Sequence, residues 1–79
     1  MLREIEVKTG VEDYFFDNEF NLTPLIHNIG EWVATRTVGR VKDIFYISTC
    51  AMEMEHYRVI NNAVSAHSVV KINEVTLRQ

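Results

Sequence analysis

The stretch STCAMEMEH, residues 48–56, concentrates side chains that could do chemistry. It holds the only cysteine of the chain, Cys50, together with two glutamates and His56. A thiol at the N-terminus of a helix has a lowered pKa and is a better nucleophile. On one straight helix, the six-residue spacing rotates the Cys50 and His56 side chains apart by about 600°, so that they face away from each other. The spacing argues against a cysteine–histidine pair within one chain, and we expect Cys50 to be a buried or half-buried packing residue.

The same stretch contains one pattern that is typical of metal sites. Glu53 and His56 are spaced as Glu-x-x-His, the pair used by carboxylate-bridged di-metal bundles. Such a bundle needs two of these motifs and two further glutamates, which a second copy of the chain would have to supply together with Glu31. A two-residue match recurs often by chance, and the chain has no pair of cysteines to suggest zinc. We therefore predict neither a metal nor a cofactor.

The sequence carries no familiar enzyme signature. It contains no Gly-x-Ser-x-Gly elbow, and TVGRVKD has a single glycine without the Gly-Lys-Ser/Thr of a phosphate loop. Small enzymes can still assemble a site across subunits. One alternative is therefore a small-molecule-binding or catalytic homo-oligomer that brings Cys50, His56 and Arg40 together at an interface. The prediction leans towards a protein that is not an enzyme and has no catalytic residues.

One basic cluster, TRTVGRVK, places Arg36, Arg40 and Lys42 within seven residues. These cations form a candidate anion-binding set, and a second alternative is a nucleic-acid-associated regulator that uses them. However, cations are also expected near the end of a helix, where they complement its dipole. The net charge of −3 and the pI of about 5.5 argue against nucleic acid, since a small nucleic-acid binder is usually basic.

The segment VEDYFFDNEF, residues 11–20, has the most unusual composition, because it combines four aromatic side chains with four carboxylates. In a strand, Phe15 and Phe16 point to opposite faces, so one of them must be exposed, buried between subunits or bound to a partner. Aromatic anchors with acidic neighbours are typical of an interface that steers a basic protein. The competing interpretation is a core hairpin with a solvated acidic rim. The predicted interaction residues are Asp13, Tyr14, Phe15, Phe16, Asp17, Glu19 and Phe20.

Several segments have the composition of strands. LREIEVK, residues 2–8, alternates apolar and polar positions, and VEDYFF, residues 11–16, is rich in aromatic residues. The turn dipeptide at residues 17–18 follows, after which EFNL either adds a third strand or leads into a helix. In VKDIFYIS, residues 41–48, apolar groups occupy both faces, which predicts a central strand covered by helices or by another copy of the chain.

A helix is predicted over residues 23–39. Thr23 is a good N-cap, Pro24 suits the first helical position, and Gly39 can close the end.

A second helix is predicted over residues 50–62, capped by Ser48 or Thr49, with a continuous helix over residues 50–70 as the competing interpretation. The tail SVVKINEVTLRQ is rich in β-formers, and its apolar phase changes near Asn73, which predicts a turn or a bulge.

These elements predict one α+β domain over residues 1–79, approximately ββ(β)-α-β-α-β, in which two helices pack on one sheet. A chain of 79 residues buries roughly 60–65% of its surface on folding, so an additional apolar contact with a second copy would stabilise it. We expect a cytoplasmic homodimer, since no signal peptide or membrane span is visible.

The composition and the acidic-aromatic segment together predict a small non-enzymatic protein-binding module. It would act as an inhibitor, adaptor or regulatory subunit, of the kind that viruses or mobile elements encode. The expected partner is another protein, whereas a membrane and a nucleic acid are not expected.

Overall fold

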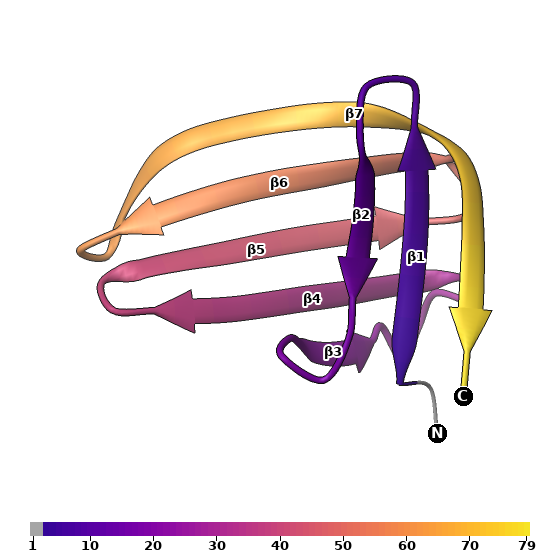
Figure 1. The fold of residues 1–79 in the computed structure, drawn as a ribbon, viewed down its shortest axis with the longest axis horizontal. Helices are drawn as coiled ribbons and strands as arrows, with labels where there is room; N and C mark the ends of the chain where they lie inside the picture. The colour runs from indigo at the N-terminus through magenta and orange to yellow at the C-terminus, as the bar shows by residue number, and fades with distance from the viewer. Residues whose placement is uncertain (1–2) are drawn as a thin grey trace.

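The computed structural model describes residues 3–79 as seven antiparallel strands, without a helix in that range (Figure 1). The strands form one sheet in the order β2-β1-β7-β6-β5-β4-β3, which curls into a half-barrel. The predicted α+β fold with two helices is therefore wrong. The strands are β1 (Glu4–Thr9), β2 (Asp13–Phe16), β3 (Asn21–Pro24), β4 (Glu31–Val38), β5 (Val41–Ser48), β6 (Glu53–Ile60) and β7 (Ala63–Arg78).

The longest strand, β7, belongs to both parts of the half-barrel. Its first half pairs with β6 and its second half pairs with β1, and the strand bends between them (Figure 1). Lys8 pairs with Glu74, but the next residue, Thr9, pairs with Ile72, which leaves Asn73 as an extra residue. The irregularity predicted near Asn73 is confirmed as a bulge, and it occurs where the strand changes partner.

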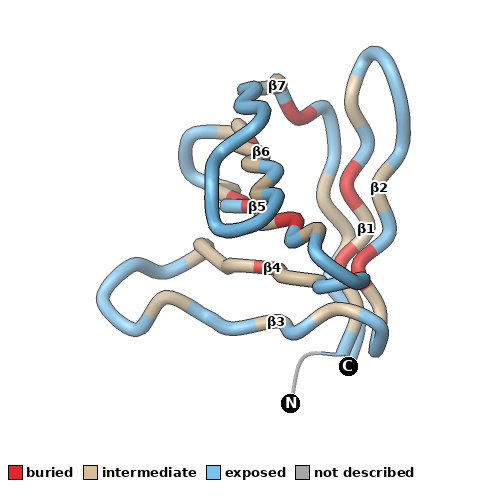
Figure 2. Tube along the Cα trace, turned by 90° about the vertical axis from the view of Figure 1, so that its left-hand side faces the viewer, coloured by how far each residue is buried: buried red, intermediate tan, exposed pale blue. Residues whose placement is uncertain are grey.

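The β1–β2 hairpin crosses the inner side of β4, β5 and β6 (Figure 1). Phe16 of the hairpin is 1% exposed, and its ring centroid lies 4.9 Å from that of Phe45 on β5. Figure 2 shows buried positions on both parts of the half-barrel. The core consists of Ile5, Val7, Phe16, Ala34, Phe45, Ile47, Met54 and Ile72. Burying a side chain of the size of Phe16 contributes about 1.5–3 kcal/mol, so the contact between Phe16 and Phe45 helps to hold the two parts of the half-barrel together.

The helix predicted over residues 23–39 is wrong. Thr23 and Pro24 end β3, an edge strand, where the missing proline N–H costs no ladder hydrogen bond. A loop then leads to β4, whose sequence EWVATRTV is rich in β-branched residues. Gly30 before β4 and Gly39 after it have φ angles of +82° and +62°, so both act in turns. Signals that suit a helix cap here mark the ends of strands.

The helix predicted over residues 50–62, and the competing one over residues 50–70, are also wrong. Ser48 accepts a hydrogen bond at 3.1 Å from the Ala51 amide, but this bond closes a turn between β5 and β6. At the other end of β6, Asn61 and Asn62 have φ angles of 50° and 66°. Two consecutive positive φ angles form a two-residue type I′ hairpin turn, for which asparagine is well suited.

The strands predicted over residues 2–8, 11–16 and 41–48 correspond to β1, β2 and β5. The predicted first residue of β1, Leu2, lies outside the described residues. The segment EFNL supplies the start of the short strand β3, as one of its two interpretations predicted.

Candidate functional site

Strand β2 divides the acidic-aromatic segment between two surfaces. Phe16 is buried, and Tyr14 packs against the same core with its ring centroid 5.9 Å from that of Phe45. Phe20 joins them, 5.0 Å from Phe16 in an edge-on arrangement. Phe15 is 46% exposed on the other face of the strand. Three of the four aromatic side chains thus anchor the hairpin, and only Phe15 is free to contact a partner.

The predicted carboxylates are distributed in a similar way. Asp13 is exposed and lies two residues before Phe15, on the same face of β2. Asp17 accepts the Glu19 amide at 2.9 Å within the turn, and Glu19 pairs with Arg36 at 3.5 Å. The outer face of the hairpin also carries Glu6 of β1, which is not among the predicted interaction residues; it lies directly opposite Phe15 and 3.9 Å from Arg78. We call Phe15, Asp13 and Glu6 the acidic edge.

The basic cluster does not form one surface. The Arg36 guanidinium lies 4.7 Å from the centre of the Phe20 ring. In the register of β4 and β5, Arg36 is opposite Asp43, whereas Lys42 is opposite Thr37. Because side chains alternate along a strand, Arg36 and Lys42 point to opposite faces of the sheet. Arg40 lies in the β4–β5 turn and lines one depression together with Lys42, so two of the three cations lie together and Arg36 lies apart.

The structure also separates Cys50, His56 and Arg40 within one chain. Cys50 is exposed in the β5–β6 turn, where its thiol donates to the Ile29 carbonyl at 3.3 Å. The predicted packing role of Cys50 is wrong, because the turn places it at the surface. Arg40 lies at the opposite end of β5, and eight strand residues span about 26 Å.

A buried polar network on β5 and β6 is the main feature that the sequence analysis missed. Asp43 is buried, and its Oδ1 atom lies 2.9 Å from His56 Nε2 and accepts a hydrogen bond from Arg58 Nε at 3.0 Å. The His56 ring stacks on Phe45 with centroids 4.1 Å apart. Burial alone would raise the pKa of Asp43, but the hydrogen bonds from Arg58 and His56 outweigh it and hold the pKa below its usual value.

A sequence signal for this network was available. Asp43 shares the inner face of β5 with Phe45 and Ile47, so an acid stands on the apolar side of the strand. A buried carboxylate needs a partner. His56 and Arg58 supply it from the neighbouring strand, which fixes the pairing of β5 with β6.

One hydroxyl lies near the histidine–aspartate pair of the network. Ser68 lies opposite His56 in the register of β6 and β7, which places a hydroxyl beside the histidine–aspartate pair. Within residues 3–79, however, no hydrogen bond joins the side chains of Ser68 and His56. The same residues include no group of three or more histidine, cysteine, aspartate or glutamate side chains that could hold a metal ion.

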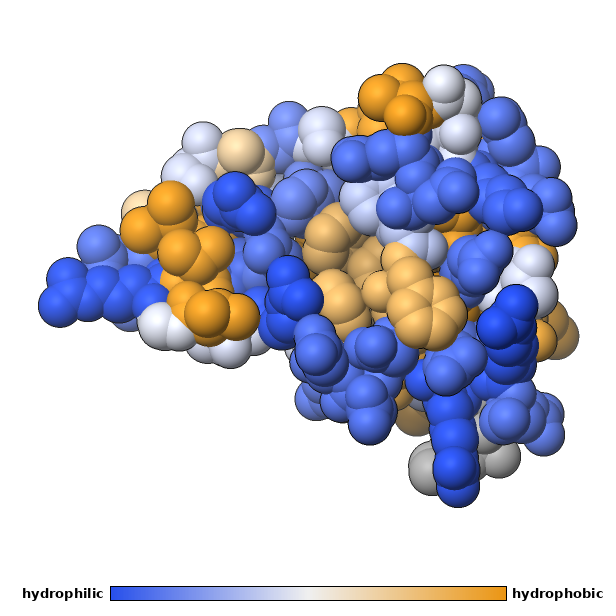
Figure 3. Space-filling view, viewed as in Figure 1, coloured by the Kyte–Doolittle hydropathy of each residue, from blue (hydrophilic) through white to orange (hydrophobic). Residues whose placement is uncertain are grey.

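The inner face remains open beyond the β1–β2 hairpin. Figure 3 shows apolar side chains at the far end of the long strands, away from the hairpin, and lighter aromatic ones near the centre. Two exposed apolar residues of the inner face, Val38 and Ile60, lie beside the β4–β5 and β6–β7 turns.

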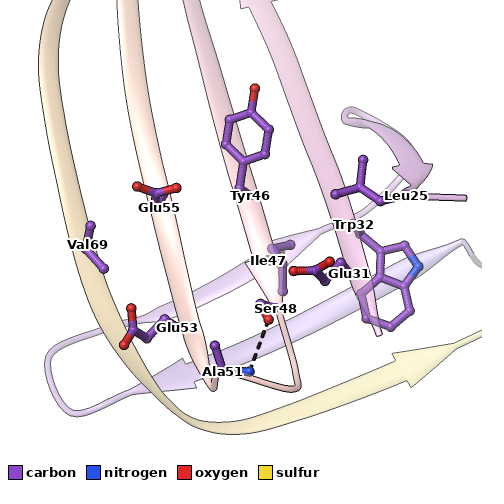
Figure 4. Close-up of a pocket in the computed structure, with 10 residues that line it drawn as sticks. All are labelled: Leu25, Glu31, Trp32, Tyr46, Ile47, Ser48, Ala51, Glu53, Glu55 and Val69. Carbon is purple, nitrogen blue, oxygen red and sulfur yellow. Dashed lines mark hydrogen bonds between the residues drawn. The ribbon is translucent and has the colours of Figure 1, made fainter. Parts of the chain in front are cut away.

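The outer face of β4, β5, β6 and the first half of β7 carries a second set of aromatic residues. Tyr46 and Tyr57 meet edge to face with centroids 5.9 Å apart, and Tyr57 stacks on His67 at 4.2 Å. The β1–β2 hairpin lies on the other side of this sheet (Figure 1). Towards the β5–β6 turn, a shallow depression of about 300 Å³ lies between Leu25 and Tyr46. Figure 4 shows three carboxylates around it, those of Glu31, Glu53 and Glu55.

Among residues 3–79 there is no helix that could span a membrane. Comparison of the chain with models of known families, with curated proteins and with solved structures finds no match.

Proposed function

We propose that the chain is a small protein-binding module that receives a basic, extended segment of another protein along strand β2. The strongest support is the position of Phe15, which is 46% exposed while its neighbour Phe16 is buried in the core. The buried neighbour fixes the strand, so the exposed ring is presented with little conformational freedom to lose on binding. Rigid aromatic anchors of this kind carry much of the affinity of protein interfaces.

The position of β2 in the sheet also supports the proposal. It is the first strand in the order β2-β1-β7-β6-β5-β4-β3, and a strand at the edge of a sheet presents backbone groups to which an incoming strand can pair. Only four residues long, it offers a short contact, which suits a segment rather than a whole domain. Affinity would then come from the backbone pairing and from Phe15 together.

The charge around β2 indicates the partner's chemistry. On the face that carries Phe15, two cations, Lys8 and Arg78, are outnumbered by the carboxylates of Asp13, Glu6, Glu4 and Glu74, and the whole chain has a net charge of −3. Carboxylates at the rim of an interface steer an oppositely charged partner and raise the association rate, an effect that salt weakens. The proposed partner is therefore a lysine- or arginine-rich segment. The chain would act on it as an inhibitor, adaptor or regulatory subunit in the cytoplasm, a location that its single cysteine supports.

The two alternative functions have less support. His56 points to the inner face and is bound to Asp43, away from the exposed Cys50, and Arg36 of the basic cluster lies apart from Arg40 and Lys42. We therefore propose neither a catalytic oligomer nor a nucleic-acid regulator.

The test is to capture partners from native cells with the wild-type chain and to measure the binding of each partner to Phe15→Ala and Asp13→Lys. Both variants should bind at least tenfold more weakly, and only Asp13→Lys should reduce the dependence of the association rate on salt. Glu53→Lys, a charge reversal on the other part of the half-barrel, is the matched control. Equal binding by all four proteins, or the absence of any partner, would exclude β2 as the contact.

A further inference from the structure

The outer face of β4, β5, β6 and the first half of β7 is more apolar than is usual for a sheet face in contact with water. Its two middle rows, read across β4, β5, β6 and β7, contain few charges: Val33, Tyr46, Glu55 and Val69, then Thr35, Ile44, Tyr57 and His67. Tyr46 and Val69 are 40% and 49% exposed. An antiparallel sheet with one solvated face normally alternates apolar residues inside with polar residues outside. The composition of these rows indicates that another surface covers them.

The charges on this face are separated along the strands. At the β5–β6 end, Ser48 on β5 lies between Glu31 on β4 and Glu53 on β6 in a single row, and the row continues to Lys71 on β7, which pairs with Glu53 at 3.3 Å. At the other end of β5, Lys42 points to the same face, and Arg40 follows in the adjacent turn. Ser48 is the sixth residue after Lys42 on β5, which places the two about 20 Å apart. The first end therefore has a net negative charge, with Glu31 as the carboxylate that Lys71 does not pair, and the other end is basic.

We propose that this face is the interface of a homodimer in which two copies pack outer face to outer face with their strands reversed. The two-fold axis then lies in the plane between the two sheets and runs perpendicular to the strands. Each strand therefore lies over the same strand of the partner and runs in the opposite direction. Lys42 of one copy meets Ser48 of the other, between the carboxylates of Glu31 and Glu53. The alternative axis, parallel to the strands, would place the acidic ends against each other, which costs free energy.

The same reversal matches the middle rows. The row that contains Tyr46 lies over the row that contains Ile44, so aromatic and branched side chains interdigitate as they do between the sheets of a sandwich. Glu55 of one copy lies over Tyr57 of the other, and the phenol can donate a hydrogen bond to that carboxylate. Every contact occurs twice, as a two-fold interface requires.

The size of the face sets the expected strength of the dimer. Four strands about 4.8 Å apart and about 27 Å long cover roughly 500 Å² on each copy. The total of about 1,000 Å² is close to the lower limit for a specific interface. We therefore expect a dimer that dissociates in the micromolar range and is sensitive to single charge reversals.

Sedimentation equilibrium of the full chain at low salt, from about 1 to 500 μM, tests the proposal. The wild type should dimerise, and Lys42→Glu, which places a carboxylate between two others, should weaken the dimer at least tenfold. The double variant Lys42→Glu with Glu31→Lys restores one attractive pair at each of the two symmetric sites and should recover much of that loss. Lys8→Glu on β1 is the matched control and should dimerise like the wild type.

Three results would overturn the proposal: a wild type that is monomeric throughout, a Lys42→Glu variant that dimerises normally, or a double variant as weak as Lys42→Glu alone. The last result would exclude the reversed arrangement in particular. Circular dichroism of each variant shows whether it is folded, and a second reversal, Glu53→Lys, repeats the test if Glu31→Lys does not fold. Phe15→Ala should leave the dimer unchanged, which separates this surface from the acidic edge.

Discussion

Replacement of Asp43 by asparagine should destabilise the protein by about 2 kcal/mol at pH 7, although the side chain keeps its shape. The substitution removes the charge that accepts hydrogen bonds from His56 Nε2 at 2.9 Å and from Arg58 Nε at 3.0 Å. A hydrogen bond to a charged group is worth about 1.5–3 kcal/mol, and we count only the one with His56. Water replaces the bond to Arg58, whose side chain is 50% exposed.

The loss is large enough to measure directly. For a chain of 79 residues the entropy of unfolding is about 0.17 kcal/mol/K, so a loss of about 2 kcal/mol lowers Tm by about 12 °C. Urea unfolding can be followed by the fluorescence of Trp32, the only tryptophan, which packs against the core. Asp13→Asn, at an exposed position, is the control and should change the free energy of unfolding by less than about 0.5 kcal/mol.

The effect of Asp43→Asn should also depend on pH. The pKa of Asp43 is lowered in the folded protein from an ordinary value of 3.8, so between these two values the unfolded chain binds more protons than the folded one. The stabilisation is complete above the ordinary pKa and is lost as the pH falls through the folded value. The difference between wild type and variant should therefore shrink below about pH 4. A difference under about 0.5 kcal/mol at pH 7, or one that stays constant down to pH 3, would refute this account of the network.

Three further predictions concern the hairpin and one turn. Phe16→Ala should cost about 3–5 kcal/mol in urea unfolding, whereas Phe15→Ala, on the exposed face, should cost less than about 1 kcal/mol; similar losses would contradict the assignment of faces. Burial and the hydrogen bond to Glu12 raise the pKa of Tyr14 to about 12, so a tyrosine should titrate at that pH by NMR and stability should fall between pH 10 and 12; a midpoint near 10 for Tyr14 would be inconsistent. Gly30→Ala should lower Tm, because φ is +82° and an added Cβ atom would collide with the β5–β6 turn; an unchanged Tm would argue against this backbone.

The strands with clear patterns could be predicted from the sequence. β1 alternates, and β5 carries apolar residues on both faces. β6 could not be recognised in the same way, because its inner face carries His56 and Arg58 between Met54 and Ile60, which hides the period of two. Its turn residues were also ambiguous, since a serine that accepts an amide hydrogen bond closes a tight turn as readily as it caps a helix.

The partners of Asp43 in the polar network could not be predicted from the sequence. The presence of Asp43 on an apolar face was visible, but its partners come from the next strand, and their identity depends on the register of pairing. That register is itself stabilised by the network. The acidic-aromatic segment illustrates the opposite case, since the period of two in β2 correctly separates Phe15 from Phe16 without knowledge of any partner strand.

The bent strand β7 has a consequence for synthesis on the ribosome. β1 leaves the exit tunnel before the other strands of the sheet, but it pairs with the second half of β7, where Ile5 is opposite Leu77. The meander β4–β5–β6 contains only local pairings and can form early during translation, whereas β1 must wait for residues 72–78. Until then the β1–β2 hairpin lacks its partner strand β7, and its apolar side can bind chaperones or aggregate. Folding of this domain is therefore completed only after residues 72–78 have emerged.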